Sequence, residues 1–203
     1  MTGSRSRDDA GQAFPIYITV VAGLLFLAFA YLAVGQAAAN RNGAQTAADA
    51  AALAAALDTR DKITDKWVEN VLDPTKWQDI FAGVGVDFNG CARADQLAAQ
   101  NDATRLGCDA VSEPYPGYTV IVKTNKTVGD SIVPGVEGKQ SIESATAVIE
   151  PLCEFKLLGE DADALPKLEC DGGVEWTLDP DDLTDLPGPE DLFDVHLARA
   201  NDE

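Results

Sequence analysis

The sequence has very little histidine and few basic residues. His196 is the only histidine among 203 residues, which excludes His-rich metal sites and makes a Ser-His-Asp enzyme a poor fit. Lysine and arginine number 15 against 34 aspartates and glutamates, giving a formal net charge of −19 and a pI near 4.2. This charge would repel a phosphate backbone and argues against nucleic-acid binding. We also expect it to oppose peripheral docking on anionic lipid.

Catalytic signatures are missing as well. The chain contains no G-x-S-x-G, H-E-x-x-H or P-loop motif. His196 lies among acidic residues near the C-terminus, which favours a surface position over a catalytic base. A glycosidase-like carboxylate pair stays open, although no apolar pocket that would raise a carboxyl pKa is evident in the sequence. We therefore expect no enzymatic activity, no catalytic residue, no cofactor and no small-molecule substrate.

Charge is absent between Asp9 and Arg41. Within this gap, the 21 residues from Phe14 to Val34 are predominantly apolar. At about 1.5 Å per residue, a helix of this length spans roughly 30 Å, the thickness of a bilayer's hydrocarbon core. The sequence therefore predicts a leader over residues 1–13 and a membrane helix over residues 14–35, with lipid as a partner. A buried core helix is the alternative.

The flanking charges predict the orientation of this helix. Arg5, Arg7 and the terminal amine precede the helix, whereas Arg41 follows it, which favours a cytoplasmic N-terminus and an extracytoplasmic bulk. The protein would then be a single-pass protein of the cell membrane. A cleaved signal peptide is a further alternative, because Ala37 and Ala39 form an A-x-A-like site.

Proline is absent between Pro15 and Pro74. Alanine, the strongest helix former, dominates after Val34, so we predict one helix from about Pro15 to Asp58, with residues 36–60 as an alanine-rich extension. Small residues recur at every fourth position and would let another membrane helix approach closely. Chance spacing in an alanine-rich run is the alternative, and the two glycines could equally mark a bend. The stripe consists of Gly35, Ala39, Gly43, Ala47, Ala51 and Ala55.

The stretch QAAANRNGAQTAADAAALAAA, from Gln36 to Ala56, resembles the N-terminal region of Tad (tight-adherence) pilus-assembly proteins of the TadE/TadG type. These proteins carry a short leader, one membrane helix and a Q-x-A-A-D-A-A-A-L-A-A signature. The leader RDDAGQAFP resembles that of actinobacterial members. The resemblance covers about residues 5–58 and implies a component of a Tad-type (Flp) pilus or secretion apparatus, with other membrane helices of that apparatus as partners. The matching signature positions are Gln45, Ala47, Ala48, Asp49, Ala50, Ala51, Ala52 and Leu53.

The resemblance has one informative departure. Members cut by a prepilin peptidase have a glycine before the cut and a glutamate at the fifth residue after it. Here Gly11 is followed at the fifth position by Ile16, so the usual subunit-docking charge is missing and processing after Gly11 stays open. We therefore expect a pseudopilin-like accessory protein rather than a bulk filament subunit. The alternative is a membrane-anchored extracytoplasmic binding or sensor domain of unknown ligand.

Residues 61–155 are expected to form a small extracytoplasmic α+β domain. Apolar spacing predicts helices over residues 61–72, 74–82 and 91–101. β-branched residues predict strands over residues 118–124 and 141–150. We expect Trp67 and Trp77 to pack in a core or an interface rather than to bind a ligand.

The cysteines form no C-x-x-C pair, so a zinc ribbon or a thioredoxin-type motif is unsupported. Cys91 and Cys108 are 17 positions apart, as are Cys153 and Cys170. An even cysteine count in an external domain predicts disulfides. Of the three possible connectivities we favour these two local pairs, because each closes a short loop. Four buried thiols in a cytosolic protein are the alternative.

The C-terminal segment, residues 156–203, is expected to be an acidic and partly disordered tail. From Glu150 onward there are 17 acidic residues and three basic ones. Asp179, Asp181, Asp182 and Asp185 suggest a calcium loop, but the glycine and the final glutamate of the EF-hand pattern are missing. We therefore expect no metal site there. Several leucines in this segment would allow it to dock on the domain or on a partner.

Overall fold

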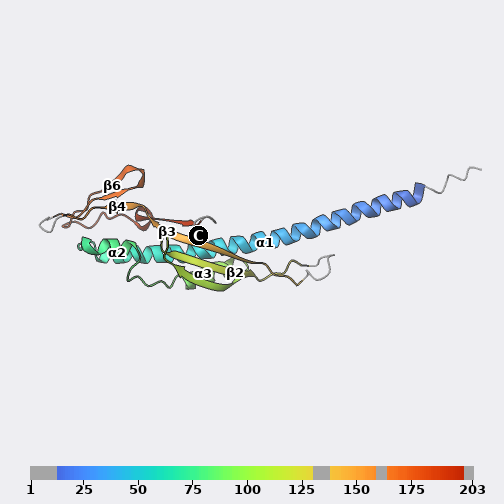
Figure 1. Ribbon diagram of the computed structural model, residues 1–203, viewed down its shortest axis with the longest axis horizontal. Helices are drawn as coiled ribbons and strands as arrows, with labels where there is room; N and C mark the ends of the chain where they lie inside the picture. The colour runs from blue at the N-terminus through green and yellow to red at the C-terminus, as the bar shows by residue number, and fades with distance from the viewer. Residues whose placement is uncertain (1–12, 130–137, 159–163, 199–203) are drawn as a thin grey trace, which may run out of the picture.

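The computed structural model describes residues 13–129, 138–158 and 164–198. A long helix projects from a small head built of further helices and strands (Figure 1). The chain therefore has the predicted fold class, a long N-terminal helix continuing into an α+β domain. In chain order the elements are α1 (Ala13–Glu69), η1 (Pro74–Lys76), α2 (Trp77–Phe81), α3 (Cys91–Gln100), β1 (Ala103–Val111), β2 (Gly117–Thr124), β3 (Ile142–Pro151), β4 (Cys153–Phe155), β5 (Leu168–Cys170), η2 (Asp171–Gly173), β6 (Val174–Trp176), α4 (Pro189–Leu192) and β7 (Phe193–Leu197).

Helix α1 is longer than predicted. One helix was expected to end near Asp58 and a second to begin near Asp61, but α1 runs unbroken to Glu69. The polar stretch between the two expected helices carries an i,i+4 ion pair, Lys62 Nζ to Asp58 Oδ2 at 2.5 Å, which suits a continuous helix. Ile63 and Trp67, which follow this ion pair on α1, are fully buried and hold the end of α1 against the head.

The two halves of α1 have different surroundings. Between Phe14 and Val34, the large apolar side chains are 36% to 83% exposed, and this half extends away from the head (Figure 1). Among the described residues, α1 is the one helix that is long and apolar enough to cross a membrane. The second half carries a fully buried face of seven alanines, namely Ala44, Ala47, Ala48, Ala51, Ala52, Ala55 and Ala56. The predicted extension is therefore also the central core element of the head.

The main sheet is antiparallel, with the strand order β1-β2-β3-β7. The alanine-rich half of α1 lies across one face of β2, β3 and β7, and α3 packs beside it against β1. The inward residues of β2 are Tyr118, Val120, Val122 and Thr124, all buried in the alternation typical of a strand with one covered face. Strands β2 and β3 and helix α3 match the predicted positions, whereas β1 and β7 were not predicted.

The described residues of the acidic C-terminal segment are largely structured, where a partly disordered tail was expected. Strands β4, β5 and β6 form a second antiparallel sheet, and α4 leads into β7 at the edge of the main sheet. Leu168, Leu192 and Phe193 are buried at 1% exposure or less and join the main core. Apolar residues at a few positions are therefore sufficient to fold an acidic segment. Residues 159–163 and 199–203, also within the expected tail, lie outside the described residues.

An aromatic cluster joins the end of α1 to the C-terminal strands. Trp67 packs edge-on against Trp77 at a centroid distance of 5.5 Å, and Phe81 contacts Phe155 and Phe193 at 5.8 and 5.0 Å. Both tryptophans are fully buried, as predicted for core residues. Edge-to-face pairs of this kind contribute about 0.5–1.5 kcal/mol each beyond their buried area.

Both predicted disulfides are formed. Cys91–Cys108 links the start of α3 to β1, and Cys153–Cys170 links β4 to β5. Within the described part of the chain no cysteine is free. The favoured local connectivity is therefore the one that the structure contains, with one bond in each half of the head.

Candidate functional site at the helix–head junction

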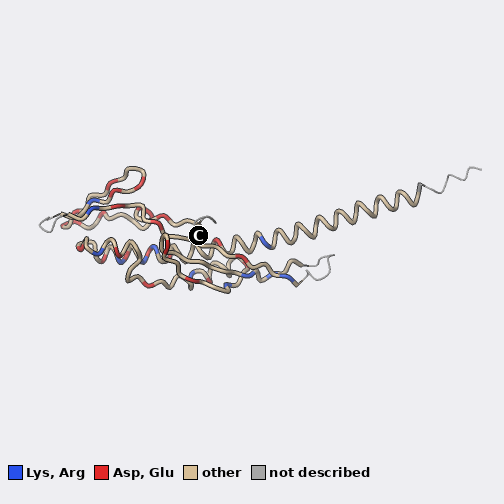
Figure 2. Tube along the Cα trace, in the orientation of Figure 1, with Lys and Arg blue, Asp and Glu red and all other residues tan. Residues whose placement is uncertain are grey.

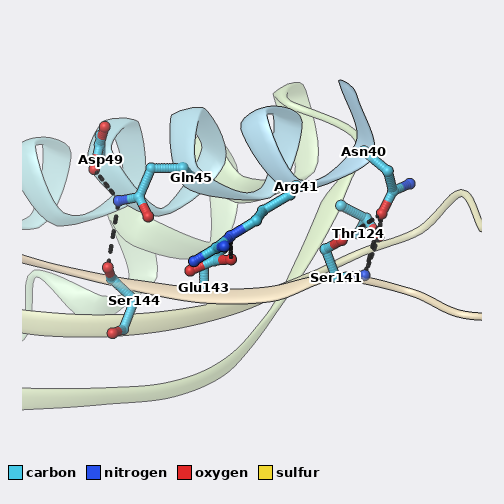
Figure 3. Close-up of polar contacts among 8 residues, drawn as sticks. All are labelled: Asn40, Arg41, Gln45, Asp49, Thr124, Ser141, Glu143 and Ser144. Carbon is cyan, nitrogen blue, oxygen red and sulfur yellow. Dashed lines mark hydrogen bonds and ion pairs between the residues drawn. The ribbon is translucent and has the colours of Figure 1, made fainter. Parts of the chain in front are cut away.

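The junction lies where α1 first meets the sheet, and Asn40 is its first contact. Asn40 Oδ1 accepts hydrogen bonds from Ser141 Oγ at 2.7 Å, from Ser141 N at 3.2 Å and from Thr124 Oγ1 at 3.3 Å (Figure 3). Asn40 Nδ2 donates to the Lys126 carbonyl oxygen at 3.0 Å. One amide side chain thus ties both arms of the β2–β3 hairpin to α1.

The next residue on α1 forms an ion pair with the same strand. Arg41 Nε lies 2.7 Å from Glu143 Oε1 on β3. The arginine side chain is 74% exposed, so solvent screens the pair and its contribution to stability is at most about 1 kcal/mol. The pair fixes the position of the strand along α1 more than it adds stability.

The third contact between α1 and the sheet involves Gln45, a polar position of the signature described above. Gln45 Nε2 donates to Asp49 Oδ1 at 2.7 Å, one turn along the helix, and to the Ser144 carbonyl oxygen at 3.4 Å (Figure 3). Gln45 therefore lies in the seam between α1 and β3, and Asp49 accepts its second hydrogen bond on the helix. The spacing of four between glutamine and aspartate is the spacing that puts them on neighbouring turns of one helix face.

The alanine positions of the signature form the buried face beside this seam. Ala47, Ala48, Ala51 and Ala52 are fully buried, whereas Ala50 and Leu53 are half-buried beside α3. Side chains this small let a helix lie close to a sheet and to a second helix at once. Packing within this chain thus explains why the signature has alanine at these positions, because a larger side chain would not fit at the buried ones.

The predicted stripe of small residues does not form a single surface. Positions four apart on an α-helix are offset by about 40°, so the stripe winds around α1 by about half a turn over its length. Ala47, Ala51 and Ala55 face the head and are buried, whereas Gly35, Ala39 and Gly43 are exposed. Half of the stripe therefore packs within the head, and only the half nearer the apolar stretch is exposed and could contact another helix. A Cβ at Gly43 would meet no atom within 4 Å.

A buried hydroxyl cluster fixes α1, α3 and β2 together. The Tyr118 hydroxyl on β2 accepts the backbone N–H of Gly90 at 3.0 Å and is bonded to Thr59 Oγ1 on α1 at 2.9 Å. Tyr118 and Thr59 are fully buried. Gly90 must be glycine for steric reasons, because a Cβ there would lie 2.4 Å from the Ala55 carbonyl oxygen.

A shallow open groove separates α1 from α3. The residues that line it include Ala50, Leu53 and Leu97, together with charged side chains such as Asp58 and Arg93. Beside the groove, Arg105 on β1 forms a two-bond ion pair with Asp95 at 2.6 and 3.0 Å, and these hydrogen bonds hold the pKa of Asp95 below its usual 3.8. No buried carboxyl or histidine lines the groove.

In the structure, two aspartates of the candidate calcium loop and His196 form hydrogen bonds with residues two positions away in the sequence. Asp179 accepts a hydrogen bond from the backbone N–H of Asp181. Asp182 accepts hydrogen bonds from the backbone N–H and the hydroxyl of Thr184, and the bond from the hydroxyl lowers the pKa of Asp182. His196 is half-exposed on β7, with Nδ1 2.9 Å from Asp194 Oδ2. Over residues 13–129, 138–158 and 164–198, no three His, Cys, Asp or Glu side chains are grouped so that they could hold a metal ion.

Sequence reasoning missed Asn40, Thr59 and Tyr118. Arg41 is the first charged residue after the apolar run and directly follows Asn40, a signal that could have marked the junction. Nothing near Thr59 or Tyr118 in the sequence indicates that they meet, because 59 positions separate them. Contacts of this kind follow from the sheet topology rather than from a local pattern.

Comparison with known proteins gives one match. Residues 11–58 match the family described as "Putative Flp pilus-assembly TadE/G-like". No curated protein and no solved structure matches the chain. The matched segment comprises the apolar half of α1 and the alanine face with its Gln45–Asp49 pair. Residues 11–58 of this chain are therefore similar to the TadE/G-like segment of Flp pilus-assembly proteins, which confirms the resemblance seen in the signature.

Proposed function

We propose that this chain is a membrane-anchored structural or accessory component of a Tad-type (Flp) pilus assembly or secretion system, with a pseudopilin-like role. One observation carries the proposal: the TadE/G-like segment is a single helix that is apolar enough for a bilayer at one end and is the core of a folded head at the other. A rigid connection of this kind suits a protein that holds a domain at a fixed place beside a membrane assembly. We also propose that the chain has no enzymatic activity.

We further propose that the N-terminus is cytoplasmic and the head extracytoplasmic. The two disulfides support this orientation, because disulfides persist in oxidising compartments. Arg5 and Arg7 support it through the excess of positive charge before the helix. Other helices of the apparatus would pack in the membrane and along the exposed part of α1 near Gly43.

The alternative role is an anchored binding or sensor domain. The open groove between α1 and α3 favours it, since Leu53 and Leu97 there are only half-buried. In that role a soluble ligand would occupy the groove, and the helix would serve only as an anchor.

A photo-crosslinking amino acid at position 43 distinguishes the two roles. Gly43 is exposed and has open space at its Cβ position, so the probe should not disturb the fold. The matched control carries the probe at Val174 on β6, which is 50% exposed and remote from the membrane half of α1. Capture of pilin subunits or of the membrane proteins of a secretion apparatus from position 43 and not from position 174 supports assembly. Capture of only a soluble ligand contradicts it.

A further inference from the structure

Charge is distributed unevenly along the molecule. The neck of the β2–β3 hairpin, residues 124–129 and 138–141, carries Lys126 and Lys139, with Lys123 just before it and Arg41 beside it on α1. These four cations lie at the end of the head that faces the apolar half of α1, whereas acidic residues predominate around β4–β6 at the opposite end (Figure 2). The overall charge of −19 thus conceals a cationic end.

The cations at this end are only partly neutralised. Arg41 is paired with Glu143 at 2.7 Å and Lys126 with Asp102 at 2.6 Å, and in both pairs the cation is more than 70% exposed. Within the described ranges, Lys123 and Lys139 have no acidic partner. Among the described residues, the neck together with Lys123 and Arg41 therefore presents four cations, and the two carboxylates paired with them, Glu143 and Asp102, are already engaged.

The position of the neck along α1 is set by the hydrogen bonds of Asn40. The apolar run ends at Val34, six residues earlier, which is about 9 Å along the helix axis. The polar headgroup layer on each side of a bilayer is about 5–8 Å thick. The described arms of the hairpin run beside α1 on the side of its apolar half (Figure 1). Asn40 therefore lies just beyond the headgroup layer, and the arms of the hairpin run from there toward the lipid headgroups (Figure 1).

The net charge of the whole chain does not determine the electrostatic interaction between the hairpin neck and an anionic bilayer. Charges separated from the bilayer by more than about 10 Å are largely screened at 0.1 M ionic strength. The acidic residues around β4–β6 lie at the far end of the head, so they contribute little repulsion at the membrane surface (Figure 2). This qualifies the expectation, drawn from the pI, that the chain as a whole would be repelled by anionic lipid.

We propose that the hairpin neck, with Arg41, binds the phosphate groups of anionic phospholipid headgroups and so seats the head on the membrane surface. The inference rests on the proposed membrane anchoring of α1. The headgroup contact, added to the Asn40 contact, fixes the height and the tilt of the head relative to the bilayer. Each lysine that reaches an anionic surface favours the membrane-bound position of the head over the unbound one by about fivefold.

The test labels lysine amines on the full chain with a membrane-impermeant acylating reagent. The chain is reconstituted in vesicles of phosphatidylcholine alone or in vesicles that also contain phosphatidylglycerol, and labelling at each lysine is measured by mass spectrometry. Lys167, which is 60% exposed on the acidic side of the head, is the internal reference. We expect labelling of Lys126 and Lys139 to slow about fivefold in the anionic vesicles. In about 1 M salt, where the Debye length is about 3 Å, this protection should be lost.

Matched variants separate a local contact from a general charge effect. Lys139→Glu and Lys167→Glu change the net charge equally, but only Lys139→Glu should reduce the protection of Lys126. Asp130 and Glu137 lie outside the described residues and are kept unchanged in every variant.

Two results would overturn the inference. The first is equal labelling of Lys126 and Lys139 in both kinds of vesicle. The second is equal protection by inorganic phosphate added to phosphatidylcholine vesicles, which would indicate an anion site instead of a lipid contact. Failure of the chain to float with any vesicle would instead overturn the membrane anchoring itself, so the two failures are distinguishable.

Discussion

Replacing Tyr118 with phenylalanine tests how the head is locked to α1. The substitution keeps the ring, which is fully buried, and removes only the hydroxyl that joins Thr59 to the backbone N–H of Gly90. It leaves the Gly90 donor without its partner in the interior, at a cost of about 1–3 kcal/mol. The Thr59 hydroxyl also loses its partner but can turn toward a carbonyl of its own helix. We therefore expect Tyr118→Phe to lower the free energy of unfolding by about 1–3 kcal/mol.

The measurement is denaturant unfolding of the full chain in detergent micelles, followed by the fluorescence of the buried Trp67 and Trp77. Thr59→Val is the matched variant, and it should cost less, about 1–2 kcal/mol, because Tyr118 keeps its bond to Gly90. The double variant should cost less than the sum of the two single ones, because both remove the same bond. A change within about 0.5 kcal/mol for Tyr118→Phe, the range of ordinary surface substitutions, would refute the reasoning.

Three further predictions concern single contacts. Gly90→Ala should destabilise the head by at least about 1–3 kcal/mol, because its Cβ would lie 2.4 Å from a backbone oxygen of α1, whereas Gly43→Ala, with open space at that position, should stabilise the helix by about 0.5–1 kcal/mol; thermal unfolding compares the two. Asp95→Asn should cost less than about 1 kcal/mol at neutral pH, because the Asp95 side chain is 53% exposed. The pKa of Asp95 is lowered below 3.8 in the folded state, so its ion pair stabilises the fold above that pH; the difference between Asp95→Asn and the wild type should therefore vanish as the pH falls through the folded-state value, and a difference that persists in acid contradicts this. Replacing Cys91 and Cys108 together with serine should cost about 3 kcal/mol through the 17-residue loop, and mass mapping of the native chain under non-reducing conditions should find no free thiol.

The elements that the sequence predicted correctly have strong local signals. Strand β2 is rich in β-branched residues, α3 has alanines at helical spacing, and the absence of proline after Pro15 marks α1. The disulfide pairing was predictable for a similar reason, because local loops are the simplest to close.

Strands β1 and β7 were missed because their signals are not local. A register shift in β1 between Arg105 and Gly107 leaves Leu106 51% exposed and interrupts the alternation that marks a strand. Strand β7 has acidic residues close by and pairs with β3 through Val148 and His196, which are far apart in the sequence. Tertiary pairing stabilises both strands, and no window of the sequence contains that information.

At the candidate site, composition indicated the polar and the small residues but not their partners. Gln45 and Asp49 were recognised through the signature, and the structure shows that they bond to each other along the seam with β3. Asn40 was not recognised, because an isolated asparagine after an alanine-rich run has no distinctive pattern. Its role depends on Ser141 and Thr124, which reach it only when the hairpin folds against α1.

The central claim is that the apolar half of α1 lies in a lipid bilayer while its other half forms the core of the head. Membrane flotation after an alkaline carbonate wash, with the intact mass of the chain verified, tests it most directly. The account predicts that the full-length chain floats with the membranes and is released only by detergent. Recovery of the untrimmed chain in the soluble fraction without detergent would contradict it.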